Sequence, residues 1–318
     1  MTGSPPLIPT GTAVLMYHYV RPDDAPQRVG AGRMDLETFA AQLDDLSRNA
    51  TIVGWPEVAA ALSEGPPLPP DAVVLTFDDG HDDHHRYVLP MLAERGLPGT
   101  FFIMARDPGE GLTVAHRIHV LLALMSAAEL RDAVVDALSP TDRMRCYQAE
   151  ADHALDPFDD PVDDVKWVLQ RDLMDVAGPI MSRMIEQLVG PEADVAQALH
   201  LDARQIRELH TAGMTLGGHT HGHRWMDWLP RAESEREIAA SAAQLAALGP
   251  PRGWPFAYPY GAAPADPATL LRPAGFPAAF VATGQGRSDR YRLGRVDAEI
   301  LGPTPSSHRP ADLTRSAP

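Results

Sequence analysis

Continuous apolar runs alternate with segments of helical periodicity along the first third of the chain. The run at 72–77, AVVLTF, is apolar without alternation, which is typical of a strand buried on both faces. The runs at 12–20 and 99–104 predict two further strands. Between them, apolar residues recur at helical spacing over 35–49 and predict a helix. This order of strands and helices favours an α/β fold with a parallel sheet or barrel and helices outside.

The pattern changes over residues 107–200, which are mostly helical in character. The first pattern then resumes with a predicted helix over 202–213, for which Asp202 is the candidate N-cap and Gly213 the candidate C-cap. We therefore expect the whole chain, residues 1–318, to form one barrel domain that carries 107–200 as a helical insertion.

The composition excludes several classes of protein. The 318 residues carry a formal net charge of -16, which argues against nucleic acid or an anionic membrane surface as a partner. The chain has no apolar segment long enough to suggest a signal peptide or a membrane span, so we expect a cytoplasmic protein. The single cysteine, Cys146, excludes an intrachain disulfide and a cysteine-rich zinc site. Length and acidity are compatible with a monomer or a homo-oligomer.

Two adjacent carboxylates follow the predicted strand at 72–77. Asp78 and Asp79 lie within TFDDG, at the end where active sites of such folds are found. Like charges that close repel each other, and burial makes the repulsion stronger. A bound cation is the obvious way to offset the repulsion between the two carboxylates.

Two histidines follow another predicted strand, in the sequence HTHGH. The spacing of His219 and His223 is weak evidence by itself, and Thr220 stands where the zinc-protease motif needs a glutamate. Together with the aspartate pair, however, they can supply one carboxylate and two imidazoles to a divalent cation. The second aspartate then remains available as a base. Adjacent residues on an extended backbone point in different directions, so the two carboxylates can divide these roles.

TFDDG, HTHGH and YPYG resemble three motifs of the polysaccharide deacetylase family, the NodB-like carbohydrate esterases. The resemblance covers roughly residues 13–109 and 201–300. It implies a distorted (β/α) barrel, usually of seven strands, and an enzyme that removes acyl groups, mostly N-acetyl, with one divalent metal ion. Zinc is the expected ion, although cobalt, nickel, manganese and iron are also compatible with these ligands.

The resemblance also assigns roles to individual residues. Asp78 corresponds to the catalytic base. Asp79, His219 and His223 correspond to the metal ligands. Tyr260 follows the proline of the third motif, so its backbone N–H corresponds to the donor that stabilises the oxyanion.

The chain departs from the family pattern at the third motif. Ala257 and Tyr258 stand where the family has an arginine and a proline. Arg295 is the candidate to replace that arginine and to orient Asp78.

The late Leu-x-His motif, which supplies the catalytic acid, is also absent. His308 lies in a proline-rich, tail-like context that suits this role poorly. The N-terminal sequence VLMYHYV instead resembles the first motif of the circularly permuted branch of the family, which assigns the acid to His18.

For the substrate we expect a small N-acylated amino sugar or glycoside, with Trp225 and Trp228 as candidate walls for a sugar ring. Three alternatives stay open. The first is hydrolysis of another non-peptide C–N bond, such as a cyclic amide or imide. The second is a carbohydrate-binding relative without catalysis. The third is a protein in which zinc is only structural.

Overall fold

The computed structural model describes residues 12–25, 29, 33–154, 161–249, 253–282 and 289–301. The contacts between them divide the chain into two compact units. The barrel takes in the described residues of Met1–Asp23, Met34–Arg106 and His200–Pro318, and the helical unit takes in those of Asp24–Arg33 and Asp107–Leu199. His308, considered above as an acid, lies outside the described residues.

The barrel is built on one parallel sheet, as the sequence predicted. Its strands follow the order β10-β1-β5-β6-β7-β8-β9, and β4 also pairs with β5. The short strands β2 (Tyr19–Val20) and β3 (Arg33–Met34) lie outside this sheet. The strands of the sheet are β1 (Ala13–Tyr17), β4 (Thr51–Ile52), β5 (Ala72–Phe77), β6 (Thr100–Ile103), β7 (Thr215–Gly218), β8 (Phe256–Ala257), β9 (Ala279–Phe280) and β10 (Val296–Asp297).

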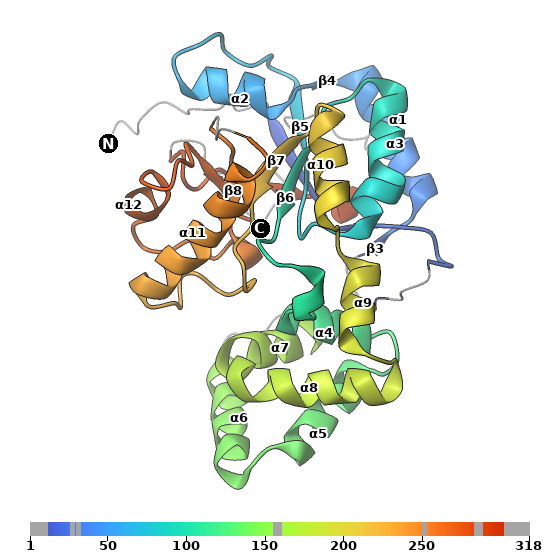
Figure 1. Cartoon of the computed structure of the whole chain (residues 1–318), viewed down its shortest axis with the longest axis vertical. Helices are drawn as coiled ribbons and strands as arrows, with labels where there is room; N and C mark the ends of the chain where they lie inside the picture. Colours follow the sequence, from blue (N-terminus) through green and yellow to red (C-terminus); the bar gives the residue numbers. More distant parts are fainter. Residues whose placement is uncertain are drawn as a thin grey trace. The chain divides into compact units, whose positions relative to one another are not determined.

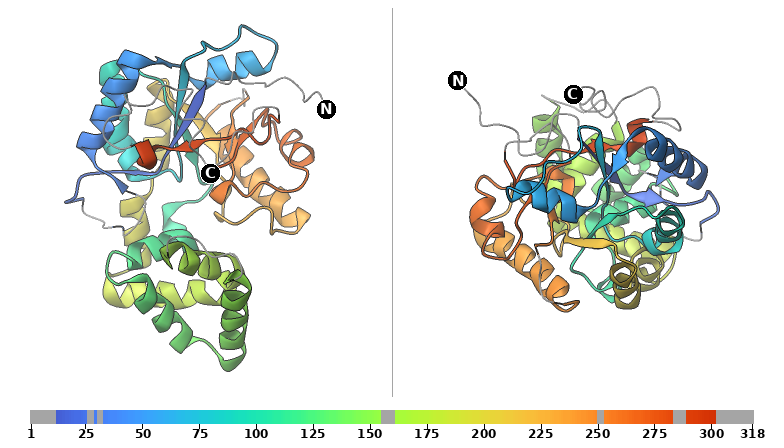
Figure 2. Two further views of the ribbon diagram at one scale, coloured as in Figure 1. Left: turned by 180° about the vertical axis from the view of Figure 1, so that it is seen from behind. Right: turned by 90° about the horizontal axis from the view of Figure 1, so that it is seen from above.

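The segment that leads into β10 brings the two edges of the sheet together. Leu293 forms a parallel bridge with Phe280 of β9, and Val281 N–H donates to its carbonyl oxygen at 3.0 Å. Three residues later, Val296 pairs with Leu15 of β1. The sheet is therefore curled, and Figure 2 shows the strands of the barrel with helices around them.

The helices of the barrel begin where the sequence places capping residues. The Asp35 carboxylate accepts from Thr38 N–H at 2.8 Å at the start of α1. Asp202 caps α10 in the same way, as predicted. The helix ends at Thr211 with Ala212 as its C-cap, so the prediction of Gly213 was wrong by one residue. Figure 1 labels these helices, which are α1 (Leu36–Asn49), α2 (Trp55–Leu62), α3 (Leu89–Arg95), α10 (Ala203–Thr211), α11 (Arg231–Ala246) and α12 (Ala268–Leu271).

A stack of aromatic rings lies directly below the ends of three neighbouring strands. Tyr17 of β1 stacks on Phe77 of β5 at 5.1 Å, and Phe77 stacks on Phe101 of β6 at 4.7 Å. All three rings are buried. His18 and Asp78 are the next residues along their strands, so this packing fixes the backbone from which they project.

The helical unit contains no strand between residues 107 and 199, as far as these are described. Arg117 of α4 and Glu192 of α9 form a half-buried ion pair at 2.8 Å that ties its two ends together. No helix in the described part of the chain is long and apolar enough to cross a bilayer. The unit's α-helices are α4 (Val114–Leu121), α5 (Ala127–Ala137), α6 (Pro140–His153), α7 (Pro161–Trp167), α8 (Met174–Leu188) and α9 (Glu192–Leu199).

Candidate metal and catalytic site

The predicted site residues lie at the carboxyl ends of parallel strands. His18 follows β1, Asp78 and Asp79 follow β5, and His219 follows β7. In the sheet β5 is adjacent to β1, and β6 alone separates it from β7. The carboxyl ends of parallel strands meet at one edge, so the sheet order brings these residues to the same end of the barrel.

Three of them converge as the ligands of one cation would. The Asp79 Oδ1 atom lies 3.1 Å from His219 Nε2 and 3.0 Å from His223 Nε2. All three side chains are buried, and each offers a ligand atom within 4.8 Å of the others. One carboxylate oxygen and two imidazole nitrogens form a donor set that suits zinc and other divalent transition metals.

The outer contact of His219 indicates which of its nitrogens can bind a metal. His219 Nδ1 lies 2.8 Å from the carbonyl oxygen of Ala257. Since a carbonyl only accepts, Nδ1 carries the hydrogen, and the lone pair of Nε2 faces Asp79 Oδ1. Two lone pairs at this distance repel each other unless positive charge lies between them. The residues present therefore fit a divalent cation at this position.

The electrostatics of His219 support the same conclusion. Burial alone would lower its pKa, but the contact with Asp79 and the charges of Asp78 and Asp79 outweigh burial and raise the pKa above its ordinary value. The site thus attracts positive charge to the Nε2 side of this ring.

The second histidine is supported by an aromatic residue. His223 Nδ1 lies 3.1 Å from the hydroxyl of Tyr260, and Trp225 stacks on the Tyr260 ring at 4.3 Å. The sequence had assigned only the backbone N–H of Tyr260, which stays a prediction, and its phenol was missed. Trp228, the other predicted wall, is 58% exposed.

Backbone strain gathers at this end of the barrel. Asp79, Thr220, His223 and Tyr260 all have positive φ, at 73°, 62°, 49° and 58°. Non-glycine residues adopt this conformation only where surrounding contacts hold them, and such residues cluster at functional sites.

The loop that carries His223 is held by a carboxylate from α11. Glu237 Oε2 accepts from the backbone N–H of His221 at 2.6 Å and of Gly222 at 2.7 Å. A Cβ at Gly222 would lie 2.8 Å from the other oxygen of Glu237, so a larger residue here would displace that carboxylate. Sequence reasoning missed Glu237, because it lies within a helix and belongs to no motif.

Asp78 is bound on both oxygens by one arginine. Arg295 donates from Nη1 to Oδ1 and from Nη2 to Oδ2, both at 2.7 Å. Burial alone would raise the pKa of Asp78, but the charges of Arg295, His219 and His18 outweigh it and hold the pKa below its ordinary value. Asp78 is therefore an ionised carboxylate in a buried site, with a lone pair left on each oxygen.

His18 lies between β1 and β2 and is half-buried. Its carbonyl oxygen accepts from His84 Nε2 at 2.9 Å. Burial lowers the pKa of His84 to about 4, so this second histidine is neutral and serves as a fixed donor to the backbone. The sequence contains His84 within its cluster of acids and histidines but gave no reason to select it.

Known proteins resemble this chain in family pattern and in fold. The polysaccharide deacetylase family model matches residues 65–129 and 176–279, just over half of the chain. No curated protein sequence matches the chain significantly.

Among solved structures, the chain is similar to a deacetylase of Streptococcus pyogenes, PplD, in complex with acetate, with 15% identity over 95% of this chain and 97% of that one and a TM-score of 0.55. IcaB from Ammonifex degensii is similar with 20% identity, 96% and 97% coverage and a TM-score of 0.55. A de-N-acetylase from Aggregatibacter actinomycetemcomitans matches with 16% identity, 89% and 93% coverage and a TM-score of 0.50. These likenesses show the fold, and the family match, together with that fold, shows that this chain belongs to the polysaccharide deacetylase family.

Proposed function

We propose that this protein is a metal-dependent hydrolase that removes an N-acyl group, N-acetyl above all, from an amino sugar or a small sugar-containing metabolite. The observation that carries the proposal is the division of labour between two adjacent aspartates. Asp79 completes a three-donor set, while Arg295 holds Asp78 ionised beside it. The family supplies the reaction class, and we take zinc as the favoured ion because two of the three donors are imidazoles.

The residues divide the reaction as follows. A divalent cation held by Asp79, His219 and His223 would polarise the acyl carbonyl and lower the pKa of water toward ~7. Asp78 accepts a proton from the water as its oxygen attacks the carbonyl carbon. The backbone N–H of Tyr260 donates to the oxyanion that forms. Protonated His18 gives its proton to the nitrogen as the C–N bond breaks, which releases the amine and the carboxylate.

The aromatic residues beside the ligands favour a sugar as the substrate. Trp225 and Tyr260 stack with ring planes only 8° apart, and the hydroxyl of Tyr260 contacts the ligand His223. Flat aromatic surfaces pack well against the apolar face of a sugar ring, because they add contact area at little cost in conformational entropy.

A non-catalytic carbohydrate-binding role is the second candidate. The pairing of Asp78 with Arg295 argues against it, because a binding module gains nothing from a buried, ionised carboxylate beside a metal site. Sugar binding without any turnover, in a metal-loaded protein, would favour it.

The test is acetate release from a panel of N-acetylamino sugars, sugar nucleotides and cyclic imides, together with metal analysis. We expect at least one equivalent of metal, held by Asp79, His219 and His223, and acetate from the sugars. Asp78→Asn should keep the metal and lose activity by about 10²- to 10⁴-fold. Asp175→Asn, on the exposed surface of the helical unit, is the matched control and should change neither. Normal turnover by Asp78→Asn would overturn the assignment, and cleavage of imides alone would redirect it to another C–N bond.

A further inference from the structure

We propose that Asp79, His81 and His200 form a second divalent-cation site in the barrel, next to the first. This inference goes beyond the proposed function and rests on it only in that Asp79 is shared. The two sites would use different oxygens of the same carboxylate.

The backbone aligns the two histidines. His81 and His200 form an antiparallel bridge, and Leu201 N–H donates to the carbonyl oxygen of Gly80 at 2.9 Å. Residues directly opposite each other in an antiparallel pair project their side chains to the same face. The TFDDG turn is thereby tied to the residues that precede α10.

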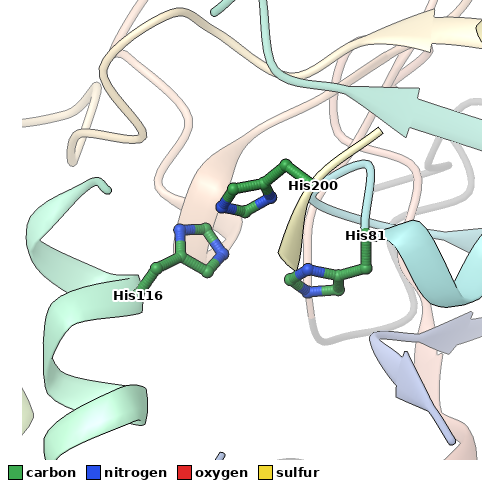
Figure 3. A group of neighbouring side chains, drawn as sticks. All are labelled: His81, His116 and His200. Carbon is green, nitrogen blue, oxygen red and sulfur yellow. The ribbon is translucent and has the colours of Figure 1, made fainter. Parts of the chain in front are cut away.

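The side chains follow this alignment. The rings of His81 and His200 are stacked, with centroids 5.5 Å apart and planes 20° apart. Figure 3 shows the two side chains. Each ring has a nitrogen within 4.8 Å of a nitrogen of the other. His116, also labelled in Figure 3, is a residue of the helical unit, and the proposed site does not include it.

The carboxylate of Asp79 faces both groups of histidines. Its Oδ1 atom contacts His219 and His223 at 3.1 and 3.0 Å, and its Oδ2 atom lies 3.3 Å from Nε2 of His81. Both oxygens of Asp79 therefore lie at similar distances from imidazole nitrogens. A carboxylate placed in this way can bridge two cations, an arrangement found in hydrolases with metals about 3.5–4 Å apart.

Both histidines of the proposed site are buried. His81 is 0% exposed and His200 is 7% exposed. Neutral imidazole is the ligand form, and it suits zinc, cobalt and nickel. Tyr19 stacks on His81 at 3.9 Å and holds the orientation of its ring.

A simpler role for His81 would be to orient Asp79 as a ligand of the first cation. That role needs one imidazole and predicts one cation per chain. The second buried imidazole, His200, aligned with His81 by the backbone, is what favours a cation here. The two possibilities therefore differ in stoichiometry.

The experiment is a titration of untagged, chelator-treated full-length protein with Co²⁺ or Zn²⁺. It is followed by visible absorption for Co²⁺ and by the metal-to-protein ratio after dialysis for both ions. We expect two equivalents for the wild type and one for each of His81→Gln, His200→Gln and His219→Gln. His81→Gln/His219→Gln should bind none. His85→Gln changes a partly exposed histidine of the same segment, which pairs with Glu208, and should retain two equivalents.

The outcomes separate this inference from the proposed function. One equivalent in the wild type, lost in His219→Gln but kept in His81→Gln and His200→Gln, overturns the second site and leaves the first intact. One equivalent lost in His81→Gln and His200→Gln but kept in His219→Gln supports the second site and removes the metal centre of the proposed function. No binding overturns both. Circular dichroism shows whether each variant is folded. A glutamine variant that does not fold is replaced by the asparagine variant at the same position.

Discussion

The barrel and the helical unit use the same kind of ion pair in opposite settings. In the barrel, Arg295 and Asp78 meet at 2.7 Å with side chains that are 0% and 3% exposed. In the helical unit, Arg145 and Asp175 meet at 3.1 Å with side chains that are 43% and 64% exposed. Water screens the second pair and leaves it worth little, whereas the first cannot lose one partner without leaving a charge in the protein interior. Burial, and not the identity of the residues, decides which pair can serve chemistry.

The two units also differ in backbone conformation, because strained non-glycine residues are found in the barrel. All five non-glycine residues with positive φ in the described part of the chain belong to the barrel, and four of them are Asp79, Thr220, His223 and Tyr260 of the site. The described helical unit has only glycines in this conformation. Rigid parallel strands hold the strained residues in place, which a site that needs fixed geometry requires.

The largest effect should come from breaking the buried pair. Arg295→Met leaves Asp78 buried without its partner and should cost about 3–5 kcal/mol of unfolding free energy. Burial then dominates and raises the pKa of Asp78, so the acid limb of the kcat/KM profile should move to higher pH. Denaturant unfolding and pH–rate profiles measure the two effects.

A double variant provides the control for this prediction. Arg295→Met/Asp78→Asn removes both charges, so it should recover much of the stability lost by Arg295→Met alone. If the double variant were as unstable as the single one, packing of the arginine stem, and not the ion pair, would account for the loss.

The next effect concerns pH and a buried histidine of the barrel. Burial lowers the pKa of His84 from 6.5 to about 4. Between these values the unfolded chain binds more protons than the folded protein, so this histidine makes stability fall as pH falls through the window, by about 3 kcal/mol in full.

His84→Phe cannot take up this proton in either state. The unfolding free energy of the variant minus that of the wild type should therefore increase by about 3 kcal/mol as the pH falls from 7 to 4. Any pH-independent difference between the two proteins does not affect this change. The neighbouring Asp83, whose pKa burial raises to about 6, acts in the opposite direction but is present in both proteins and cancels. Parallel stability curves for the two proteins would refute the assignment.

A smaller effect should follow from loosening the loop that carries His223. Glu237→Ala removes an acceptor of two backbone hydrogen bonds and should cost about 2 kcal/mol. Metal affinity should fall about 10- to 100-fold, because the ligand loop loses its support. Calorimetric titration with the metal measures the affinity. Glu235→Ala changes an exposed residue of the same helix and should leave the affinity unchanged.

The smallest effect should come from the helical unit. Arg145→Ala removes an exposed pair and should change the unfolding free energy by less than about 1 kcal/mol, with any change reduced further by salt. A loss comparable to that of Arg295→Met would mean that exposure does not separate the two classes of ion pair. Thermal unfolding at low and high ionic strength decides this.

Much of the barrel could be predicted, because its elements carry local signals. The apolar run of β5 and the capping aspartate Asp202 act over a few residues of sequence, and each lies where its pattern indicates. The convergence of Asp79, His219 and His223 followed from a rule about the ends of parallel strands and from a family resemblance.

The supporting residues of the site could not be predicted, since their partners are distant in sequence and their roles depend on three-dimensional packing. Glu237 binds a loop about 15 residues away, and His84 contacts the carbonyl of His18, 66 residues away. Arg295 was selected only because the family arginine is replaced by Ala257 in this chain. Nothing in the sequence around Arg295 marks it as the partner of Asp78.

The distance in sequence between Arg295 and Asp78 has a consequence for folding during synthesis. The two residues are 217 positions apart, and Arg295 immediately precedes β10, the last strand of the described chain. During synthesis from the N-terminus, β1, β5 and β6 emerge and can pair long before the arginine exists. Until then, docking these strands places the carboxylate of Asp78 in an apolar environment without its cation, which resists premature closure. The segment that leads into β10, the last strand of the described barrel to be synthesised, therefore supplies the charge that Asp78 needs once it is buried.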